Sequence, residues 1–179
     1  MADVLDLLLA QHARIEELFG RVLHDTGDAR RDRFEELVRL LAVHETAEEE
    51  VVHPRGRGAG GVEDAVIDAR LAEEHDAKRL LADLVDLGVD HPDFEQRLIE
   101  LRDMVLMHAK REERYEFPRL AQHLPPQERE RLGTLLLTAE RFAPTRPHAG
   151  VETAAANLFA GPLLAVSDRV RDAIRDAMR

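Results

Sequence analysis

Two pairs of side chains with the spacing HxxxE could bind a metal ion: His44 with Glu48, and His108 with Glu112. Four residues correspond to about one turn of an α-helix, so the two members of each pair lie over the same turn. Imidazole nitrogens and carboxylate oxygens both present lone pairs, and they therefore converge naturally on a cation. The spacing occurs five times in the chain, but only these two pairs have both members on an apolar helical stripe.

Each stripe is the set of positions that recur at alternating spacings of three and four residues in a predicted helix. Such positions face the neighbouring helices. Three of the stripes are Leu5, Leu8, His12, Ile15, Phe19 and Val22; Phe34, Leu37, Leu41, His44, Glu48 and Val51; and Phe94, Leu98, Leu101, Val105, His108, Glu112 and Tyr115. The remaining helix carries Leu71, His75, Lys78, Ala82 and Val85 on one side. Burying an unpaired imidazole or carboxylate is costly, and four histidines with two glutamates would satisfy each other poorly, which predicts a shared cation. The alternative is a metal-free bundle with hydrogen-bonded core histidines.

An internal repeat supports the metal site. A shift of 64 residues aligns HETAEEEVVHPR, which begins at His44, with HAKREERYEFPR, which begins at His108. The same shift brings His12 within one residue of His75. Each half therefore reads as one helix with a histidine followed by one helix with HxxxE, which predicts a pseudo-twofold bundle.

The elements that must position these residues are helices. Leu, Ala, Glu and Arg dominate and aromatic residues make up only 4% of the chain, which favours an all-α protein. Helices are expected from residue 2 to the mid-twenties, from 28 to just before Pro54, and over 62–88, 92–118, 124–142 and 162–178, with residues 55–61 as a loop. We expect an antiparallel up-down four-helix bundle in residues 1–123 and a fifth helix in 124–142. Residues 143–179 are expected to form a linker and an amphipathic helix that packs on the bundle or at an interface.

Composition excludes several functional classes. The 25 Lys and Arg against 36 Asp and Glu give a net charge of −11, which argues against nucleic acid and anionic membranes as partners. The absence of cysteine rules out disulfides, thiolate clusters and a cysteine nucleophile. With no signal peptide or membrane-spanning stretch recognised, cytoplasmic residence is expected.

His12, the segment that begins at His44, the EEH that ends in His75, and the segment from His108 through Glu112 resemble the hemerythrin-like, HHE cation-binding domain. The resemblance covers roughly residues 1–123 and implies a four-helix bundle around a non-heme pair of iron ions with an oxo or hydroxo bridge. It also implies a ligand set: the four histidines as terminal ligands, and Glu48 and Glu112 as bridges between the two ions.

The sequence departs from the pattern of the oxygen-carrying hemerythrins, in which the third helix carries HxxxH and the fourth helix carries HxxxxD. Here His75 is followed four residues later by Arg79, and the fourth helix offers Glu112. The implied ligands fill about ten of about twelve octahedral positions, which leaves room for peroxide, dioxygen, nitric oxide or water.

This vacancy favours a redox protein that reacts with small oxygen or nitrogen species, most specifically one that decomposes hydrogen peroxide in a catalase- or peroxidase-like reaction. The alternative is a non-catalytic protein that binds or senses iron, oxygen or nitric oxide. The partner is then a small ligand, and the chain is a monomer or a homodimer.

Further polar residues lie beside the predicted site. Glu45 is read as a solvated helix residue, with contact to a ligand histidine as the alternative. His53 is read as a surface or cap residue, because it falls about 900° after His44 and so on the opposite face; only local unwinding before Pro54 would bring it inward. Tyr115 continues the stripe and could donate a hydrogen bond near the site. Lys78 is read as reaching outward or facing a ligand channel.

Overall fold

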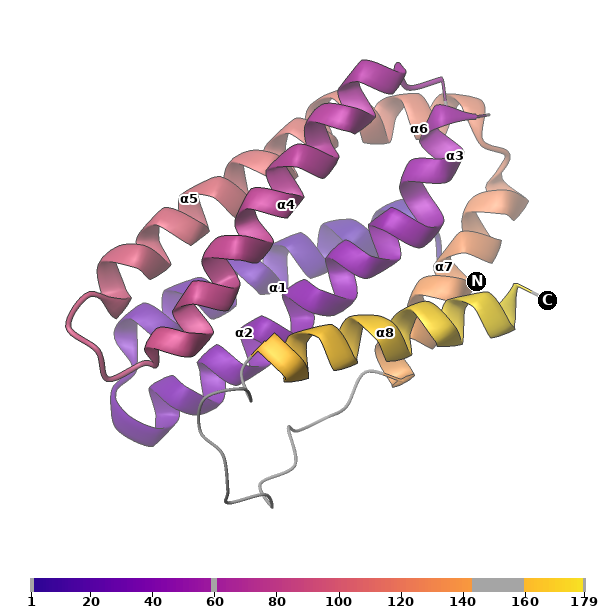
Figure 1. The fold of residues 1–179 in the computed structure, drawn as a ribbon. Coiled ribbons are helices and arrows are strands. Elements are labelled where there is room, and N and C mark those ends of the chain that lie inside the picture. The colour runs from indigo at the N-terminus through magenta and orange to yellow at the C-terminus, as the bar shows by residue number, and fades with distance from the viewer. Residues whose placement is uncertain (1, 59–60, 143–159, 179) are drawn as a thin grey trace.

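The computed structural model describes residues 2–58, 61–142 and 160–178, and all of its secondary structure in these ranges is helical (Figure 1). The α-helices are α1 (Val4–His24), α2 (Gly27–Ala47), α3 (His53–Arg57), α4 (Asp64–Leu87), α5 (Phe94–Arg111), α6 (Phe117–His123), α7 (Pro126–Phe142) and α8 (Ala160–Ala177). Two π-helical turns, η1 (Glu48–Val52) and η2 (Glu112–Glu116), join α2 to α3 and α5 to α6. The all-α prediction is confirmed.

Four long rods form the bundle, and each runs antiparallel to the next along the chain (Figure 1). They are α1, the continuous rod α2–η1–α3, α4, and the continuous rod α5–η2–α6. The Asp3 side chain accepts a hydrogen bond of 3.0 Å from the Leu5 backbone N–H and so caps the start of α1. Gly27 begins α2 at a φ of 57°, which lets the chain reverse within two residues after α1.

The two π turns let both rods continue as helices through Pro54 and Pro118. The expectation that the second helix ends before Pro54 was wrong: His53 has helical dihedrals (φ −59°, ψ −40°) and α3 continues to Arg57. The His53 backbone N–H bonds the carbonyl of Glu48, five residues back, and the Phe117 N–H bonds that of Glu112 in the same way. The wider turn removes the tight i−4 contact that a proline ring would otherwise meet, so Pro54 sits in the first turn of α3.

A polar layer divides the hydrophobic core into two. One cluster lies toward the start of α1 and the C-terminal helices, and includes Val4, Leu8, Val51, Phe117 and Ile174. The other lies toward the α1–α2 and α4–α5 connections, and includes Ile15, Phe19, Leu37, Leu81 and Leu98. Every predicted apolar position on the stripes of the first and second rods is buried. The predicted histidines on those stripes lie between the two clusters.

The C-terminal helices pack at one end of the bundle (Figure 1). α7 lies against α1, and α8 lies against both α2 and α7. Val170 and Ile174 of α8 are fully buried, and Arg171 forms an ion pair of 2.7 Å with Glu50 in η1. The predicted linker falls mostly in 143–159, outside the described residues. Among the described helices, none combines the length and the apolar character needed to span a membrane.

Candidate metal centre

The polar layer brings together five of the six predicted ligands, His12, His44, Glu48, His108 and Glu112. Their ligand atoms form two overlapping groups in which every donor atom lies within 4.8 Å of every other. The first group is His12, His44, Glu48 and Glu112, and the second is Glu48, Glu74, His108 and Glu112. The two glutamates of the HxxxE pairs therefore belong to both groups.

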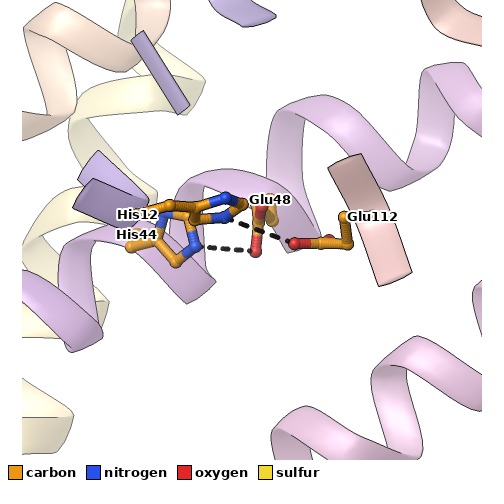
Figure 2. Close-up of side chains that lie close together, drawn as sticks. All are labelled: His12, His44, Glu48 and Glu112. Atoms are coloured by element: carbon orange, nitrogen blue, oxygen red, sulfur yellow. Dashed lines mark ion pairs between the residues drawn. The ribbon is translucent and has the colours of Figure 1, made fainter. Parts of the chain in front are cut away.

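The first group faces two imidazoles toward two carboxylates (Figure 2). The His12 Nε2 atom lies 3.5 Å from an oxygen of Glu112, and the His44 Nε2 atom lies 3.4 Å from an oxygen of Glu48. The two imidazole rings meet edge to face, with centroids 4.9 Å apart. Phe117 stacks on the other side of His12 at 5.7 Å and closes the group against the apolar cluster.

The second group contains one imidazole and three carboxylates. The His108 Nε2 atom lies 3.4 Å from an oxygen of Glu112 and 3.9 Å from one of Glu74. Glu48, Glu74 and Glu112 are all at most 2% exposed. Three carboxylates so close together and so deeply buried repel one another unless a proton or a cation intervenes.

The imidazoles of His12, His44 and His108 are oriented by hydrogen bonds that their Nδ1 atoms form with residues around the layer. Their Nδ1 atoms hydrogen-bond to Glu113 at 2.8 Å, to Gln11 at 2.8 Å and to Glu73 at 3.2 Å, for His12, His44 and His108 respectively. This arrangement is typical of metal-binding histidines, in which an outer acceptor holds Nδ1–H and directs the Nε2 lone pair to the ion.

The donor atoms of the layer fit a metal centre because protein groups do not satisfy them. The Nε2 atoms of His12 and His108, both oxygens of Glu48, and one oxygen each of Glu74 and Glu112 are buried without a hydrogen-bond partner. Each such group costs free energy, of the order of 1–3 kcal/mol. All of these atoms can donate a lone pair, so a divalent cation satisfies them together.

The electrostatics of the protein without metal reflect this crowding. Burial, with repulsion from Glu112 and Glu74, raises the pKa of Glu48 well above its usual value. Burial also opposes ionisation of Glu112, but the imidazoles of His108 and His12 outweigh it and lower the pKa of that carboxyl group. Burial would lower the pKa of His108, but Glu112 and Glu74 outweigh it and raise that pKa to about 9. His44 behaves oppositely, since burial and the neighbouring His12 lower its pKa well below the usual value.

The sixth predicted ligand, His75, is not part of this cluster. It lies exposed on the outer side of α4, and the buried face of α4 instead carries Ile67, Arg70, Glu74, Ala77, Leu81 and Leu84. The register differs by one residue from the predicted stripe because Ile67, Leu81 and Leu84 bury more apolar surface than the alternatives. The sequence contains this stripe too, as three- and four-residue steps from Ile67 to Leu84, but the adjacent stripe from Leu71 to Val85 has the same spacing.

Because of the π turns, residues beyond the HxxxE pairs lie on other faces than a regular α-helix would give them. One extra residue in a helix corresponds to about 100° of rotation, which turns His53 inward, where it is 3% exposed. The reading of His53 as a surface residue was therefore wrong. In η2 the same shift places Glu116 inside at 3% exposure and leaves Tyr115 54% exposed, so Tyr115 does not continue the stripe.

Glu45 is buried, contrary to its reading as a solvated residue. Burial raises its pKa to about 8, although Lys78 opposes the shift. Lys78 reaches across from α4 to pair with Glu49, and its Nζ atom lies 3.6 Å from Glu45 and 4.0 Å from Glu74. Lys78 thus partly neutralises the acidic layer from the side.

A cavity of about 470 Å³ reaches the centre. Its lining includes His12, His44 and His108 from the layer, Glu74 from α4, and Met107, which is 52% exposed. Four residues of the layer therefore border this cavity.

A helical bundle with a buried layer of clustered imidazoles and carboxylates belongs to the class of metal-binding four-helix bundles. The chain matches the profile described as Hemerythrin HHE cation binding domain over residues 3–125, and it belongs to that family. The predicted resemblance is thereby confirmed, and α7 and α8 lie beyond the matched residues.

Among curated proteins, the chain is similar to a DNA nickase from Nostoc sp., with 28% identity over 134 residues. The matched segment covers 74% of this chain but only 37% of the length of that relative. No solved structure matches the chain significantly.

Proposed function

We propose that the protein holds two iron ions in the polar layer and decomposes hydrogen peroxide. The observation that carries the proposal is the pair of overlapping groups that share Glu48 and Glu112, in which most inner donor atoms are buried without a protein hydrogen-bond partner. Glu48 and Glu112 belong to both groups and would help to hold both ions, and two ions would satisfy more of these atoms than one. A bound iron pair supplies a reversible change of oxidation state.

In the proposed site, the ligand side chains are buried and held in fixed orientations. His12 and His44 would hold one ion through their Nε2 atoms and His108 would hold the other, since each imidazole is oriented by a hydrogen bond at Nδ1. The cavity admits a molecule the size of peroxide, dioxygen or nitric oxide, and such a small ligand is the proposed partner. We further propose a cytoplasmic protein, monomeric or homodimeric, that binds neither nucleic acid nor membrane.

The test is oxygen release from peroxide by purified, iron-loaded protein. We expect His44→Ala and Glu112→Ala to lose at least about tenfold in rate, since each removes an inner ligand. His91→Ala is the matched control, because His91 also begins an HxxxE sequence but lies exposed at the α4–α5 connection. Rates for His44→Ala and Glu112→Ala equal to that of the control would refute the proposal.

The alternative is a non-catalytic protein that senses or binds iron, oxygen or nitric oxide. The position of the layer between two hydrophobic clusters favours it, because ligation there is coupled to packing on both sides. It predicts slow peroxide chemistry together with a large difference in melting temperature between metal-free and loaded protein. We do not extend DNA nicking to this chain, because the match covers a minor part of the Nostoc relative and the net charge of −11 disfavours a polyanion.

A further inference from the structure

The two halves of the polar layer are not chemically equal. The first group offers two imidazoles and two carboxylates, whereas the second offers one imidazole and three carboxylates. The repeat of 64 residues predicts equal halves, with His75 as the counterpart of His12. The difference arises in α4, where Glu74 faces inward and His75 faces solvent.

Glu74 is placed as a ligand and not as an incidental core carboxylate. It is 2% exposed, and its Oε1 atom lies 3.9 Å from the Nε2 atom of His108. Its Oε2 atom is buried without a hydrogen-bond partner, and the nearest cation, Lys78, lies 4.0 Å away. Glu74 therefore contributes an atom to the group that Glu48 and Glu112 form with His108, and one of its two oxygens has no hydrogen-bond partner.

The other oxygen of Glu74 is held by His53. The His53 Nε2–H donates to Glu74 Oε1 across 2.6 Å, and both side chains are at most 3% exposed. His53 reaches this position only because η1 turns it inward. The corresponding residue of the second half is Phe117, which instead stacks on His12. His53 thus orients the carboxylate of Glu74 in one half by a hydrogen bond. In the other half, the ring of Phe117 packs on the imidazole of His12.

We propose that Glu74, oriented by the hydrogen bond from His53, replaces His75 as the α4 ligand, so that the two metal ions occupy unequal donor sets. The inference rests on the proposed two-metal site and deepens it. The ion bound by His108 and three carboxylates has the harder, more oxygen-rich set, which favours harder cations and a more oxidised state than the set with two imidazoles. His53 acts as a positioning residue, since it contacts Glu74 and not the ion.

The experiment measures metal per chain by elemental analysis, and the iron environments by Mössbauer spectroscopy of protein loaded with ⁵⁷Fe. The wild type is expected to hold two irons in two distinguishable environments. Glu74→Gln keeps the size of the side chain and is expected to retain close to one iron. His75→Ala, the neighbour on the exposed face, is the matched control and is expected to retain two. Loss of one iron in His75→Ala, with two retained in Glu74→Gln, overturns the assignment.

His53 is tested with two substitutions. His53→Phe, which copies the residue at the equivalent position of the other half, is expected to weaken binding of the second ion by about 10- to 100-fold. His53→Gln keeps a donor near Glu74 and is expected to restore most of that affinity and the second Mössbauer signal. Equal affinity and spectra for wild type, His53→Phe and His53→Gln overturn the positioning role.

These outcomes separate the inference from the proposed function. Protein that holds two irons, loses one in Glu74→Gln and releases no oxygen from peroxide keeps the inference and overturns the peroxide reaction. Wild-type protein that binds neither iron nor manganese nor zinc overturns both.

Discussion

Glu48→Gln should change the stability of the protein in opposite directions with and without metal. In the metal-free state, Glu48 is fully buried, both its oxygens lack hydrogen-bond partners, and its pKa is raised by burial and by Glu112 and Glu74. Between its ordinary pKa and the raised value, the folded state holds a proton that the unfolded state has lost. The metal-free wild type therefore loses stability through this group as the pH rises through that window. A neutral amide does not titrate and removes the loss.

The magnitude follows from the burial of the group. Relief of an unsatisfied buried carboxyl group corresponds to about 1–3 kcal/mol, which for a chain of this size is about 2–12 °C in melting temperature at neutral pH. With metal present, the substitution removes a carboxylate that both ligand groups share. A site that is saturated at 100 times its dissociation constant stabilises the fold by about 2.7 kcal/mol, and Glu48→Gln should forfeit a large part of that.

The assay is thermal unfolding followed by circular dichroism from pH 5 to 8, on protein treated with a chelator and on iron-loaded protein. The metal-free variant should melt above the wild type by a margin that grows with pH, and the loaded variant should melt below the loaded wild type. If Glu48→Gln melts below wild type in both states, the layer is held together by protein contacts and the reasoning is refuted.

Three further predictions concern residues around the layer. Lys78→Met should destabilise the protein by about 1–3 kcal/mol in urea titrations, because buried Glu45 then lacks its cation. The pKa of Glu45, already raised to about 8, should rise further, so the stability of this variant should continue to fall above pH 8, where the contribution of Glu45 levels off in the wild type; parallel profiles above pH 8 would contradict this. Tyr115→Phe should leave the iron content and the absorption spectrum unchanged and alter stability by less than about 0.5 kcal/mol, since the side chain is mostly exposed; loss of iron would place Tyr115 at the site. Leu37→Ala should cost about 2–5 kcal/mol of unfolding free energy while metal content stays at the wild-type level, because Leu37 belongs to the apolar cluster on one side of the layer; a loss of metal would show that the two are coupled.

The sequence predicted most of the fold because three of the four rods have unambiguous stripes. Every apolar position from Phe34 to Leu41 and from Phe94 to Val105 on the predicted stripes is buried, and the HxxxE pairs lie on the same faces. In α4, by contrast, two adjacent stripes both contain apolar and polar residues. Single-sequence periodicity could not choose between Glu74 and His75, and the choice depends on how Ile67, Leu81 and Leu84 pack.

The π turns were the second source of difference. An α-helical period continued through η1 and η2 assigns the wrong face to His53 and Tyr115, which is why both residues were misplaced. The usable signal was the proline that follows each HxxxE segment at the same distance in both halves, together with the wider turn that a proline inside a continuing helix requires.

Each π turn adds one residue between the ligands and the end of its rod. The segment beyond the turn is therefore rotated about the helix axis relative to its position in a regular α-helix. Deletion of Val52 would restore a regular helix, leave His44 and Glu48 in place, and rotate α3 by about 100° away from its partners in α4. Insertions and deletions in this chain should therefore be tolerated very differently on the two sides of Glu48. Anyone who grafts the ligand helices onto another scaffold must transfer the wide turn with them, or the residues beyond it will point to the wrong neighbours.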